Sequence, residues 1–528
     1  MLAFLLMLVI LTGCSKSGSY PSKQEVKTTD DNYRTYYEVF LSSFYDSNGD
    51  GKGDINGLTQ KLDYLNDGHG NGLGVTGIWL MPIMPSPSYH KYDVTDYFNI
   101  DPQLGTMDDF KKLISECHAR GIKLIIDYEI NHSSDKNPWF VSAVQSIMKN
   151  PDKPGNNKYL NYYNFTRGGK PDGQYQQIGN TGWYYEDEFS PSMPDLNLDS
   201  ANVKQEISKS IKFWLSTGID GFRLDAVLSY YGGYNFCNNN KNISFLNWFA
   251  DTCKAINPKT YIVGEAWTDS SAISQYYKSH VDSFFAFPLA GKTGIIAKTL
   301  ESGDTGNNAQ TFAQEECDWQ KLLYSERTNA VDAPFLSNHD MDRSAGYFNH
   351  DLSKTKMAAG MYLTLSGNAF IYYGEEIGMT GDGKDENKRE PMLWSNKDRS
   401  GMTNGPPNMD SISPLYPAAD IQDNDKNSLL NYYRLAVRLR NENPEITRGT
   451  ETYVPISGDT NIAAIQKEYK GSKLLVVYNT STNSKTVSIP KNKFSYSKVI
   501  GSLTPDGNKI ALHGDKLTLQ PYSIAVLK

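Results

Sequence analysis

Two acidic side chains stand near the carboxyl ends of short apolar runs that predict neighbouring strands. The run GFRLDAV, residues 221–227, contains Arg223 and Asp225, and a helical pattern ending near Gly218 precedes it. The run YIVGEAW, residues 261–267, contains Glu265. Carboxylates at the ends of successive strands, each strand preceded by a helix, predict a β/α barrel with acid chemistry at its mouth.

Further polar residues follow other predicted strands. Asp127, Asn131 and His132 stand at the end of the third strand, and His339 and Asp340 stand at the end of the seventh. A single acid at a strand end is usually a cap or a salt bridge. Four strands ending this way are hard to explain structurally, because buried unpaired carboxylates are costly. The carboxyl ends of barrel strands open into one mouth, so we expect these side chains to share a site.

Apolar runs of strand length alternate with helical patterns, and this order predicts parallel strands with helices packed outside. The predicted strands are 37–44, 74–82, 122–128, 221–227, 261–267, 281–287, 333–339 and 369–373. The longer predicted helices are 55–65, 108–120, 202–218, 244–256, 309–325, 352–365 and 428–441. Eight strands predict an α/β fold, the closed (β/α)8 TIM barrel.

Two segments depart from this alternation. Residues 133–199 are rich in Asn, Gly, Pro, Tyr and Trp without a sustained helical period. A structureless loop of that length is unusual, so they predict a small irregular inserted domain. Beyond 444, alternating stretches predict antiparallel strands at 461–466, 473–478, 484–489, 516–519 and 523–527. The predicted domains are the barrel (32–132 and 200–444), the insertion (133–199) and a C-terminal β-sandwich (445–528).

The N-terminus predicts export. Its apolar run is too short to span a bilayer as a helix but fits the core of a signal peptide. The run ends in LTGC, which resembles a bacterial lipobox and implies removal of residues 1–13 and lipid attachment to Cys14. The chain departs from the usual signal peptide in one respect, because no Lys or Arg precedes the apolar run. The alternative is an uncleaved membrane anchor. Polar residues 14–31 predict a flexible tether, so we expect an extracellular, cell-surface lipoprotein held at the membrane.

Composition narrows the possible partners. The net charge is −8 and the basic residues are not clustered, which argues against nucleic acid. The chain has 35 Tyr and 8 Trp, which suit either a large core or a groove lined with flat rings that bind sugars. The internal cysteines are not spaced as a metal or redox motif; they are Cys117, Cys237, Cys253 and Cys317.

The stretch DSNGDGKGD, residues 46–54, places oxygen-bearing side chains at alternate positions with glycines between them. Such a loop can wrap a hard cation, and we expect Ca²⁺. The predicted ligands are the side chains of Asp46, Asn48, Asp50 and Asp54 and the carbonyl of Lys52. The loop resembles the first half of an EF-hand loop, but Gly57 stands at its twelfth position and no helix precedes it. The alternative is a solvated turn.

Several of these stretches together resemble a known family. DYEINH, GFRLDA, GEAW and FLSNHD are similar to the four signature stretches of the α-amylase family of glycoside hydrolases. GVTGIWLMP, MPDLN and YYGEEIGM resemble three further stretches of that family. These stretches occur in the same order as in the family. The similarity extends over about residues 36–528, nearly the whole mature chain.

The resemblance implies catalytic roles. Asp225 would be the nucleophile that forms a covalent glycosyl-enzyme intermediate, and Glu265 would protonate the leaving oxygen and then activate water. Arg223 would keep Asp225 ionised, and Asp340 would hold the sugar hydroxyls. The outcome would be retention, for which the carboxyls lie about 5–5.5 Å apart. Glu265 must start protonated, so we expect its pKa to be raised by burial and nearby carboxylates.

The resemblance also implies side chains that bind the sugar being cleaved. His132 and His339 would hydrogen-bond that sugar. In YHKY, residues 89–92, Tyr92 would stack on its face and His90 would bond it. Asp127 is expected to support Arg223.

The chain departs from many α-amylases just after the nucleophile. Those enzymes have Lys and His where this chain has Leu228 and Ser229, so the usual lysine contact on the leaving side is missing. MPDLN resembles a group intermediate between oligo-1,6-glucosidases and neopullulanases, which includes secreted α-amylases.

The activity implied is retaining, endo-acting hydrolysis of α-1,4 bonds in starch and maltooligosaccharides by a monomer. One alternative is an oligo-1,6-glucosidase or glucanotransferase on the same fold. Export, however, favours a polymer over a small oligosaccharide as the substrate. Another is a non-catalytic carbohydrate-binding barrel. Such relatives lose carboxylates, whereas Asp225, Glu265 and Asp340 are all present.

Overall fold

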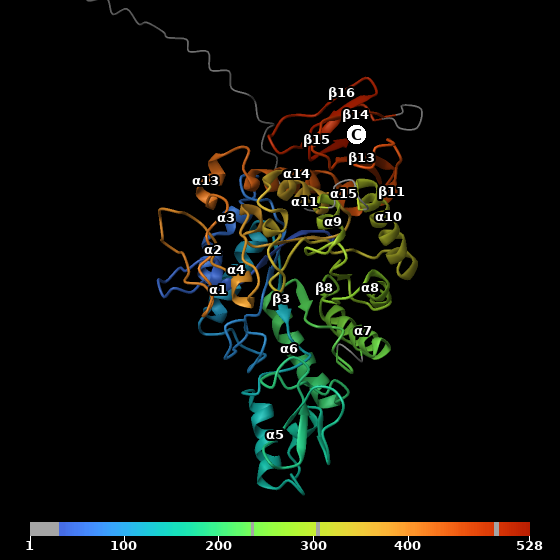
Figure 1. The fold of residues 1–528 in the computed structure, drawn as a ribbon. Helices are drawn as coiled ribbons and strands as arrows, with labels where there is room; N and C mark the ends of the chain where they lie inside the picture. The colour runs from blue at the N-terminus through green and yellow to red at the C-terminus, as the bar shows by residue number, and fades with distance from the viewer. Residues whose placement is uncertain (1–30, 234–236, 302–306, 490–495) are drawn as a thin grey trace, which may run out of the picture.

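The computed structural model describes residues 31–233, 237–301, 307–489 and 496–528. The predicted signal peptide and Cys14 lie outside these residues. The central element is a parallel seven-stranded sheet in the order β10-β1-β2-β3-β7-β8-β9 (Figure 1). Its strands are β1 (Thr35–Val39), β2 (Gly77–Leu80), β3 (Lys123–Tyr128), β7 (Gly221–Leu224), β8 (Tyr261–Gly264), β9 (Ser283–Phe284) and β10 (Ala369–Tyr372).

The predicted seventh strand closes this sheet into a barrel. Isolated parallel bridges join Phe285 to Ala333 on one side and Phe335 to Phe370 on the other. The Ala286 N–H donates to the Ala333 carbonyl at 3.0 Å, and the Phe370 N–H donates to the Pro334 carbonyl at 2.9 Å. Pro334 has no N–H to donate, which explains why this run bridges its neighbours without a regular ladder. The predicted TIM barrel is confirmed.

The strands form because their runs are mostly apolar on both faces, as is usual for parallel strands buried between helices. All four residues of β2, β7 and β8 are buried. Gly221 is required where β7 and β8 meet, because a Cβ there would lie 1.8 Å from the Tyr261 carbonyl oxygen. Gly218, with a φ of +102°, ends the helix before β7 in the left-handed conformation that favours glycine.

Helices surround the sheet. They are α2 (Ile55–Gln60), α3 (Leu62–Leu65), α4 (Met107–Ala119), α6 (Ala201–Thr217), α7 (Asn239–Ile256), α8 (Ser270–Tyr276), α9 (Ile295–Glu301), α10 (Ala309–Glu326), α11 (Leu352–Leu363) and α14 (Leu429–Glu442). The prediction of one helix over 55–65 was wrong, because Lys61 is not helical and separates α2 from α3. No helix in the described ranges is both long enough and apolar enough to cross a membrane.

The segment 133–199 projects from one end of the barrel (Figure 1). It contains α5 (Pro138–Lys149) and a three-stranded antiparallel sheet, β4 (Phe165–Arg167), β6 (Trp183–Glu186) and β5 (Tyr175–Gln177). The prediction that this segment has no sustained helix was wrong. The start signal of α5 is present, because Asn137 caps the helix and Pro138 occupies its first turn. Phe140, Ala143 and Ile147 form its buried face.

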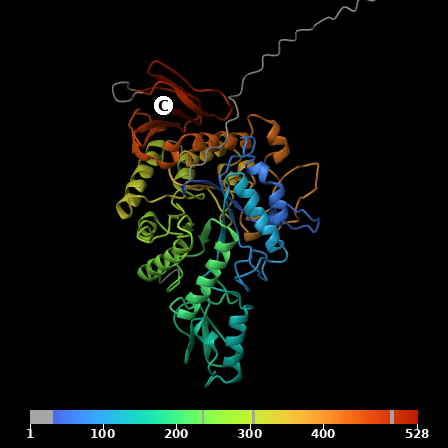
Figure 2. The same cartoon turned by 180° about the vertical axis from the view of Figure 1, so that it is seen from behind.

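The C-terminal strands lie at the other end of the molecule from the insertion, as both views show (Figures 1 and 2). One sheet has the order β11-β12-β13-β18-β15 and the other β14-β17-β16. Their bounds are β11 (Thr450–Tyr453), β12 (Ile462–Tyr469), β13 (Ser472–Asn479), β14 (Lys485–Ser488), β15 (Val499–Leu503), β16 (Ala511–His513), β17 (Lys516–Leu519) and β18 (Ser523–Leu527). The sequence did not predict β11, β15 or β16.

A long, mostly irregular excursion joins β10 to α14. It contains three short helices, η4 (Glu375–Ile377), α12 (Asp385–Lys388) and α13 (Ala419–Asn424). The Trp394 indole N–H donates to the Phe44 carbonyl at 2.6 Å, and the Met392 N–H donates to the Ser43 carbonyl at 2.8 Å. These bonds hold the excursion against the segment that follows β1, at the same end of the barrel as the predicted site.

Candidate functional site

Arg223 joins three carboxylates from three neighbouring strands. Its Nη1 lies 2.8 Å from Asp127 Oδ1 and 2.6 Å from Asp225 Oδ1, and its Nη2 lies 2.9 Å from Glu265 Oε1. The guanidinium is fully buried. The parallel register explains the meeting, since Asp127 pairs with Arg223 across β3 and β7. One cation therefore faces three acids, which cannot all ionise without cost.

The shortage of positive charge shifts the pKa values of two of these acids. Burial raises the pKa of Asp127 to about 6, because the Asp225 charge adds to the burial effect and Arg223 only partly opposes it. Burial raises the pKa of Glu265 to about 7, again against Arg223 and with added repulsion from Asp225 and Asp340. Glu265 can therefore hold a proton near neutral pH, as predicted.

The backbone after β7 fixes Glu265 beside Asp225. The Ala226 N–H donates to Glu265 Oε2 at 3.0 Å, and the Val227 N–H donates to the Glu265 carbonyl at 3.1 Å. Ala226 adopts a φ of +47°, a left-handed conformation that is uncommon for residues other than glycine. Local strain of this kind gathers at functional sites, and here it accompanies the N–H that contacts the second carboxylate.

His339 and Arg389 hold Asp340 from two sides. His339 Nδ1 lies 2.6 Å from Glu38 Oε1, and its Nε2 lies 2.9 Å from Asp340 Oδ2. Arg389 Nη2 lies 3.0 Å from Asp340 Oδ1. Burial alone would lower the pKa of His339, but Asp340 and Glu38 raise it to about 10. Burial opposes the ionised form of Asp340, yet His339 and Arg389 hold its pKa well below the usual range. Asp340 is therefore an anion, with its side chain 34% exposed.

Aromatic rings line the approach to these acids. The Tyr92 ring stacks on His339 with centroids 5.4 Å apart, and His90 stacks on Tyr92 at 6.0 Å. The Tyr92 hydroxyl donates to Asp127 Oδ2 at 3.0 Å and lies 2.6 Å from His339 Nε2. His132 Nε2 donates to the Tyr92 carbonyl at 3.2 Å. Flat rings beside hydroxyl-binding carboxylates suit a sugar ring.

All the side chains predicted for catalysis and sugar binding meet at this end of the barrel. Seven of them are linked by direct contacts of Arg223, Tyr92 and His339, and His132 contacts the Tyr92 backbone. The full set is His90, Tyr92, His132, Arg223, Asp225, Glu265, His339 and Asp340. Leu228 and Ser229, which replace the familiar Lys and His, are both buried. The Leu228 carbonyl accepts from Asn242 Nδ2 at 2.9 Å.

Sequence reasoning missed Glu38 and Arg389. Glu38 was detectable, because it is an acid within the first predicted strand, at its second residue. Arg389 was not, because it lies 49 residues beyond Asp340 in the irregular excursion. A further residue, Tyr89, donates to Asp385 Oδ2 at 2.5 Å and accepts from Arg389 Nη1 at 2.8 Å. These contacts orient Arg389 toward Asp340.

Glu129 is a buried acid that the predicted mechanism does not use. It is 0% exposed, and neither carboxylate oxygen has a hydrogen-bond partner among the described residues. Burial raises its pKa well above the ordinary value, and the charges of Asp127 and Asp225 raise it further. The folded protein therefore holds a proton on Glu129 that the unfolded chain releases at lower pH.

We expect Glu129→Gln to remove a pH-dependent loss of stability. A carboxyl with a raised folded pKa stabilises the fold below its unfolded pKa, and this contribution declines as pH rises, by up to about 1.4 kcal/mol per pH unit. Glutamine does not titrate. Between pH 5.5 and pH 7.5, the free energy of unfolding of the variant should therefore rise relative to that of wild type, as measured by urea titrations. Glu315→Gln, at an exposed site, is the matched control, and an equal pH dependence in all three proteins would contradict the assignment.

The loop predicted to bind Ca²⁺ is folded by its own oxygens. Asp46 accepts from the N–H groups of Asn48, Gly49 and Gly51 at 2.7–3.0 Å, and Asn48 and Asp50 each accept from the residue two positions later. Asp54 caps α2 by accepting from the Gly57 N–H at 2.7 Å. Within the ranges that the structure describes, no group of three or more His, Cys, Asp or Glu is arranged to hold a metal ion.

The donor set of this loop nevertheless suits a hard cation. Carboxylate, amide and carbonyl oxygens are the ligands that Ca²⁺ prefers. Backbone N–H groups lower the pKa of Asp46 against the effect of burial, which keeps it ionised. Gly49 and Gly51 adopt φ values of +84° and +86°, which let the loop fold back on Asp46.

Comparison with known proteins agrees with this geometry. The family model described as "Alpha amylase, catalytic domain" matches residues 38–449, and "Alpha-amylase SusG C-terminal domain" matches residues 462–526. "Alpha-amylase 3" of Dictyoglomus thermophilum is 36% identical, over 93% of this chain and 92% of its own. "Oligo-1,6-glucosidase" of Bacillus cereus is 28% identical, over 93% and 98%. The solved structure "Eubacterium rectale Amy13B" is 43% identical with a TM-score of 0.89, over 94% and 96%.

Proposed function

Because the chain belongs to the α-amylase family of glycoside hydrolases, we propose that it cuts internal α-1,4-glucosidic bonds of starch and maltooligosaccharides with retention of configuration. The observation that carries this proposal is the pairing of Asp225 and Glu265 on one buried guanidinium, that of Arg223. Two carboxyls that share one guanidinium are compatible with the retaining geometry, in which the carboxyls lie about 5–5.5 Å apart, whereas inverting enzymes leave room for a water between them.

In the first step, the Asp225 carboxylate attacks the anomeric carbon from the face opposite the leaving chain. Protonated Glu265 gives its proton to the glycosidic oxygen, so that bond breaks and the leaving glucan departs as an alcohol. The product is a glycosyl ester of Asp225. Arg223 favours this step, because its Nη1 lies 2.6 Å from Asp225 Oδ1 and fixes the position of the attacking carboxylate.

In the second step, ionised Glu265 takes a proton from water, and the oxygen of that water attacks the anomeric carbon. The ester bond breaks and Asp225 leaves as the carboxylate. Two inversions give net retention. The charged Asp340 would hold sugar hydroxyls next to the reacting carbon, where His339 and Arg389 fix its orientation.

The product profile tests this proposal against its main rival. The relative named "Oligo-1,6-glucosidase" aligns with this chain over 98% of its own length, which supports a second candidate, hydrolysis of α-1,6 bonds in short oligosaccharides. The products from soluble starch, pullulan and isomaltotriose are separated by chromatography. We expect a series of maltooligosaccharides from soluble starch and little product from isomaltotriose. Release of glucose alone, from isomaltose-like substrates only, would support the rival and contradict the endo-acting assignment.

We also propose that residues 46–54 hold Ca²⁺, which would stiffen this loop against the excursion after β10. The Asp46 N–H donates to the Gly401 carbonyl at 2.8 Å, and the Asn404 N–H donates to the Gly51 carbonyl at 2.8 Å. Ligands would come from Asp46, Asn48, Asp50 and Asp54, with the Lys52 carbonyl.

Chelation is expected to lower the Tm of the wild-type protein by several degrees, because a bound ion stabilises only the folded state. Asp50→Asn should reduce the effect of the chelator, since it removes a charged ligand. Lys52→Ala is the matched control, because it keeps the backbone carbonyl. A Tm that does not respond to chelator and Ca²⁺ in differential scanning calorimetry would rule out the site.

We propose export and lipid attachment at Cys14, because the N-terminal run has the length of a signal-peptide core and ends in LTGC. A Cys14→Ser chain that still partitions with membranes would contradict the lipid anchor.

A further inference from the structure

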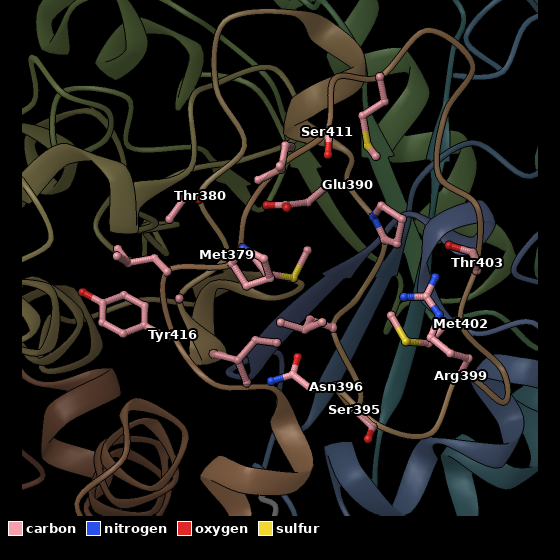
Figure 3. Close-up of a pocket in the computed structure, with 18 of the residues that line it drawn as sticks. Met379, Thr380, Glu390, Ser395, Asn396, Arg399, Met402, Thr403, Ser411 and Tyr416 are labelled. Atoms are coloured by element: carbon pink, nitrogen blue, oxygen red, sulfur yellow. The ribbon is translucent and has the colours of Figure 1, made fainter.

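A second hollow lies outside the barrel mouth, within the excursion between β10 and α14. Its volume is about 390 Å³, and its walls are formed by some of the residues of three segments, 377–380, 390–404 and 409–416 (Figure 3). This volume lies within the range of about 300–1,000 Å³ that is usual for small-molecule sites. None of the predicted catalytic or sugar-binding residues lines it.

The walls combine apolar surface with polar groups. Met379, Met402 and Met409 supply thioether side chains. Asn396 and Arg399, both exposed at the rim, supply hydrogen-bond donors. Figure 3 shows Glu390 beside Met379, with the Arg399 guanidinium across the hollow near Met402. A ligand with both apolar faces and hydrogen-bond acceptors would therefore suit these walls.

Two charged residues line the hollow, Glu390 and Arg399. Glu390 is buried, and its Oε1 lies 3.3 Å from Arg343 Nε and accepts from the Gly381 N–H at 2.9 Å. Arg343 and the Gly381 N–H thus compensate the Glu390 charge. Arg399 adds one positive group at the exposed rim. A sugar matches these walls, because its C–H faces can pack on the thioether side chains and its hydroxyls can accept hydrogen bonds from Arg399 and Asn396.

The same short segment forms a wall of the hollow and supports the catalytic mouth. Arg389 contacts Asp340 at 3.0 Å, while its neighbour Glu390 lines the hollow. Two bonds fix this segment, because Ser43 Oγ donates to the Arg389 carbonyl and Tyr373 Oη donates to the Glu390 carbonyl, each at 2.7 Å. The hollow therefore adjoins the groups that would hold the sugar at the cleavage site.

We propose that this hollow is a second, non-catalytic site for α-glucan, which holds one or two glucose units of a chain whose other part lies in the mouth or on a neighbouring chain. The inference rests on the proposed function, since it takes the substrate class from there. A second contact raises the effective concentration of a polymer at the enzyme, and it gives no advantage to a substrate that fills only the mouth.

The test compares a polymer with a short substrate. In the double variant Asn396→Ala, Arg399→Ala, we expect KM for soluble starch to rise about 3- to 30-fold, because donors to sugar hydroxyls are lost. Its kcat on starch, and both constants on p-nitrophenyl maltotrioside, should match wild type. Lys397→Ala is the matched control, since this exposed neighbour does not line the hollow.

Two outcomes would overturn the inference while leaving the proposed function intact. One is an unchanged KM for starch in the double variant. The other is an equal change on starch and on the short substrate, which would mean that the variant disturbs the mouth itself. A wild-type chain that does not hydrolyse starch would overturn both the inference and the proposed function.

Discussion

Replacement of Asp225 by Asn is expected to lower kcat on p-nitrophenyl maltotrioside and on starch by about 10³-fold or more, because the amide cannot form the glycosyl ester. The fold should survive. Asn is nearly isosteric with Asp, and Arg223 keeps its contacts with Asp127 and Glu265. Initial rates give the kinetic result, and a Tm within a few degrees of wild type shows that the variant is folded.

A matched variant separates loss of the nucleophile from loss of any surface acid. Asp398→Asn makes the same chemical change at an exposed position outside the mouth, and it should leave kcat unchanged. An Asp225→Asn protein that is pure, folded and retains more than a tenth of the wild-type kcat would show that Asp225 does not attack the sugar.

Replacement of Glu265 by Gln is expected to lower kcat by about 10²–10⁴-fold and to change the pH profile. Wild-type kcat/KM should fall as pH rises above about 7, because the first step needs the protonated acid and its pKa is about 7. The Gln side chain cannot transfer a proton at any pH. The variant should therefore lack this alkaline limb.

An α-maltosyl fluoride separates the two steps in the Glu265→Gln variant. Fluoride leaves without protonation, so the ester should form at a rate near that of wild type, and its hydrolysis should remain slow for want of a base. Stopped-flow detection should show a burst close to one fluoride per enzyme, followed by slow turnover. A variant with the wild-type alkaline limb and no burst would assign the acid–base role to another residue.

The meeting of the candidate site residues was predictable because several physical constraints act on short, local stretches. Strands buried on both faces are mostly apolar, so an acid at such a strand's end is conspicuous. Parallel strands of a barrel open to one end, so Asp225 and Glu265 had to be neighbours. Their shared contact with Arg223 follows from the β3–β7–β8 register.

The missed parts depend on contacts between segments far apart in the chain. Arg389 has no local pattern that marks it, and its role arises only because the excursion folds back onto Asp340. The motif DYEINH contains Glu129, but only the folded barrel shows that no partner reaches its carboxylate within the described ranges. Helix α5 was missed because the Gly, Asn and Pro residues around it obscured the spacing of Phe140, Ala143 and Ile147.

The loop at 46–54 shows a different reason why a residue's role could not be predicted from the sequence. Its alternating oxygens were evident from the sequence, and the folded loop uses several of them to bind its own N–H groups. Asp54 also caps α2, a role that the spacing of the acids did not suggest. Composition alone could not distinguish a ligand from a helix cap, because a carboxylate suits both.

The most direct test of the central claim is to trap the covalent intermediate. A 5-fluoro-α-maltosyl fluoride should react to leave a slowly hydrolysed ester, because fluorine next to the ring oxygen destabilises the charged transition states of both steps. Mass spectrometry of proteolysed enzyme should then find one added 5-fluoromaltosyl group on the peptide that contains Asp225. Labelling on any other residue, or turnover to the β-anomer without an adduct, would contradict the mechanism.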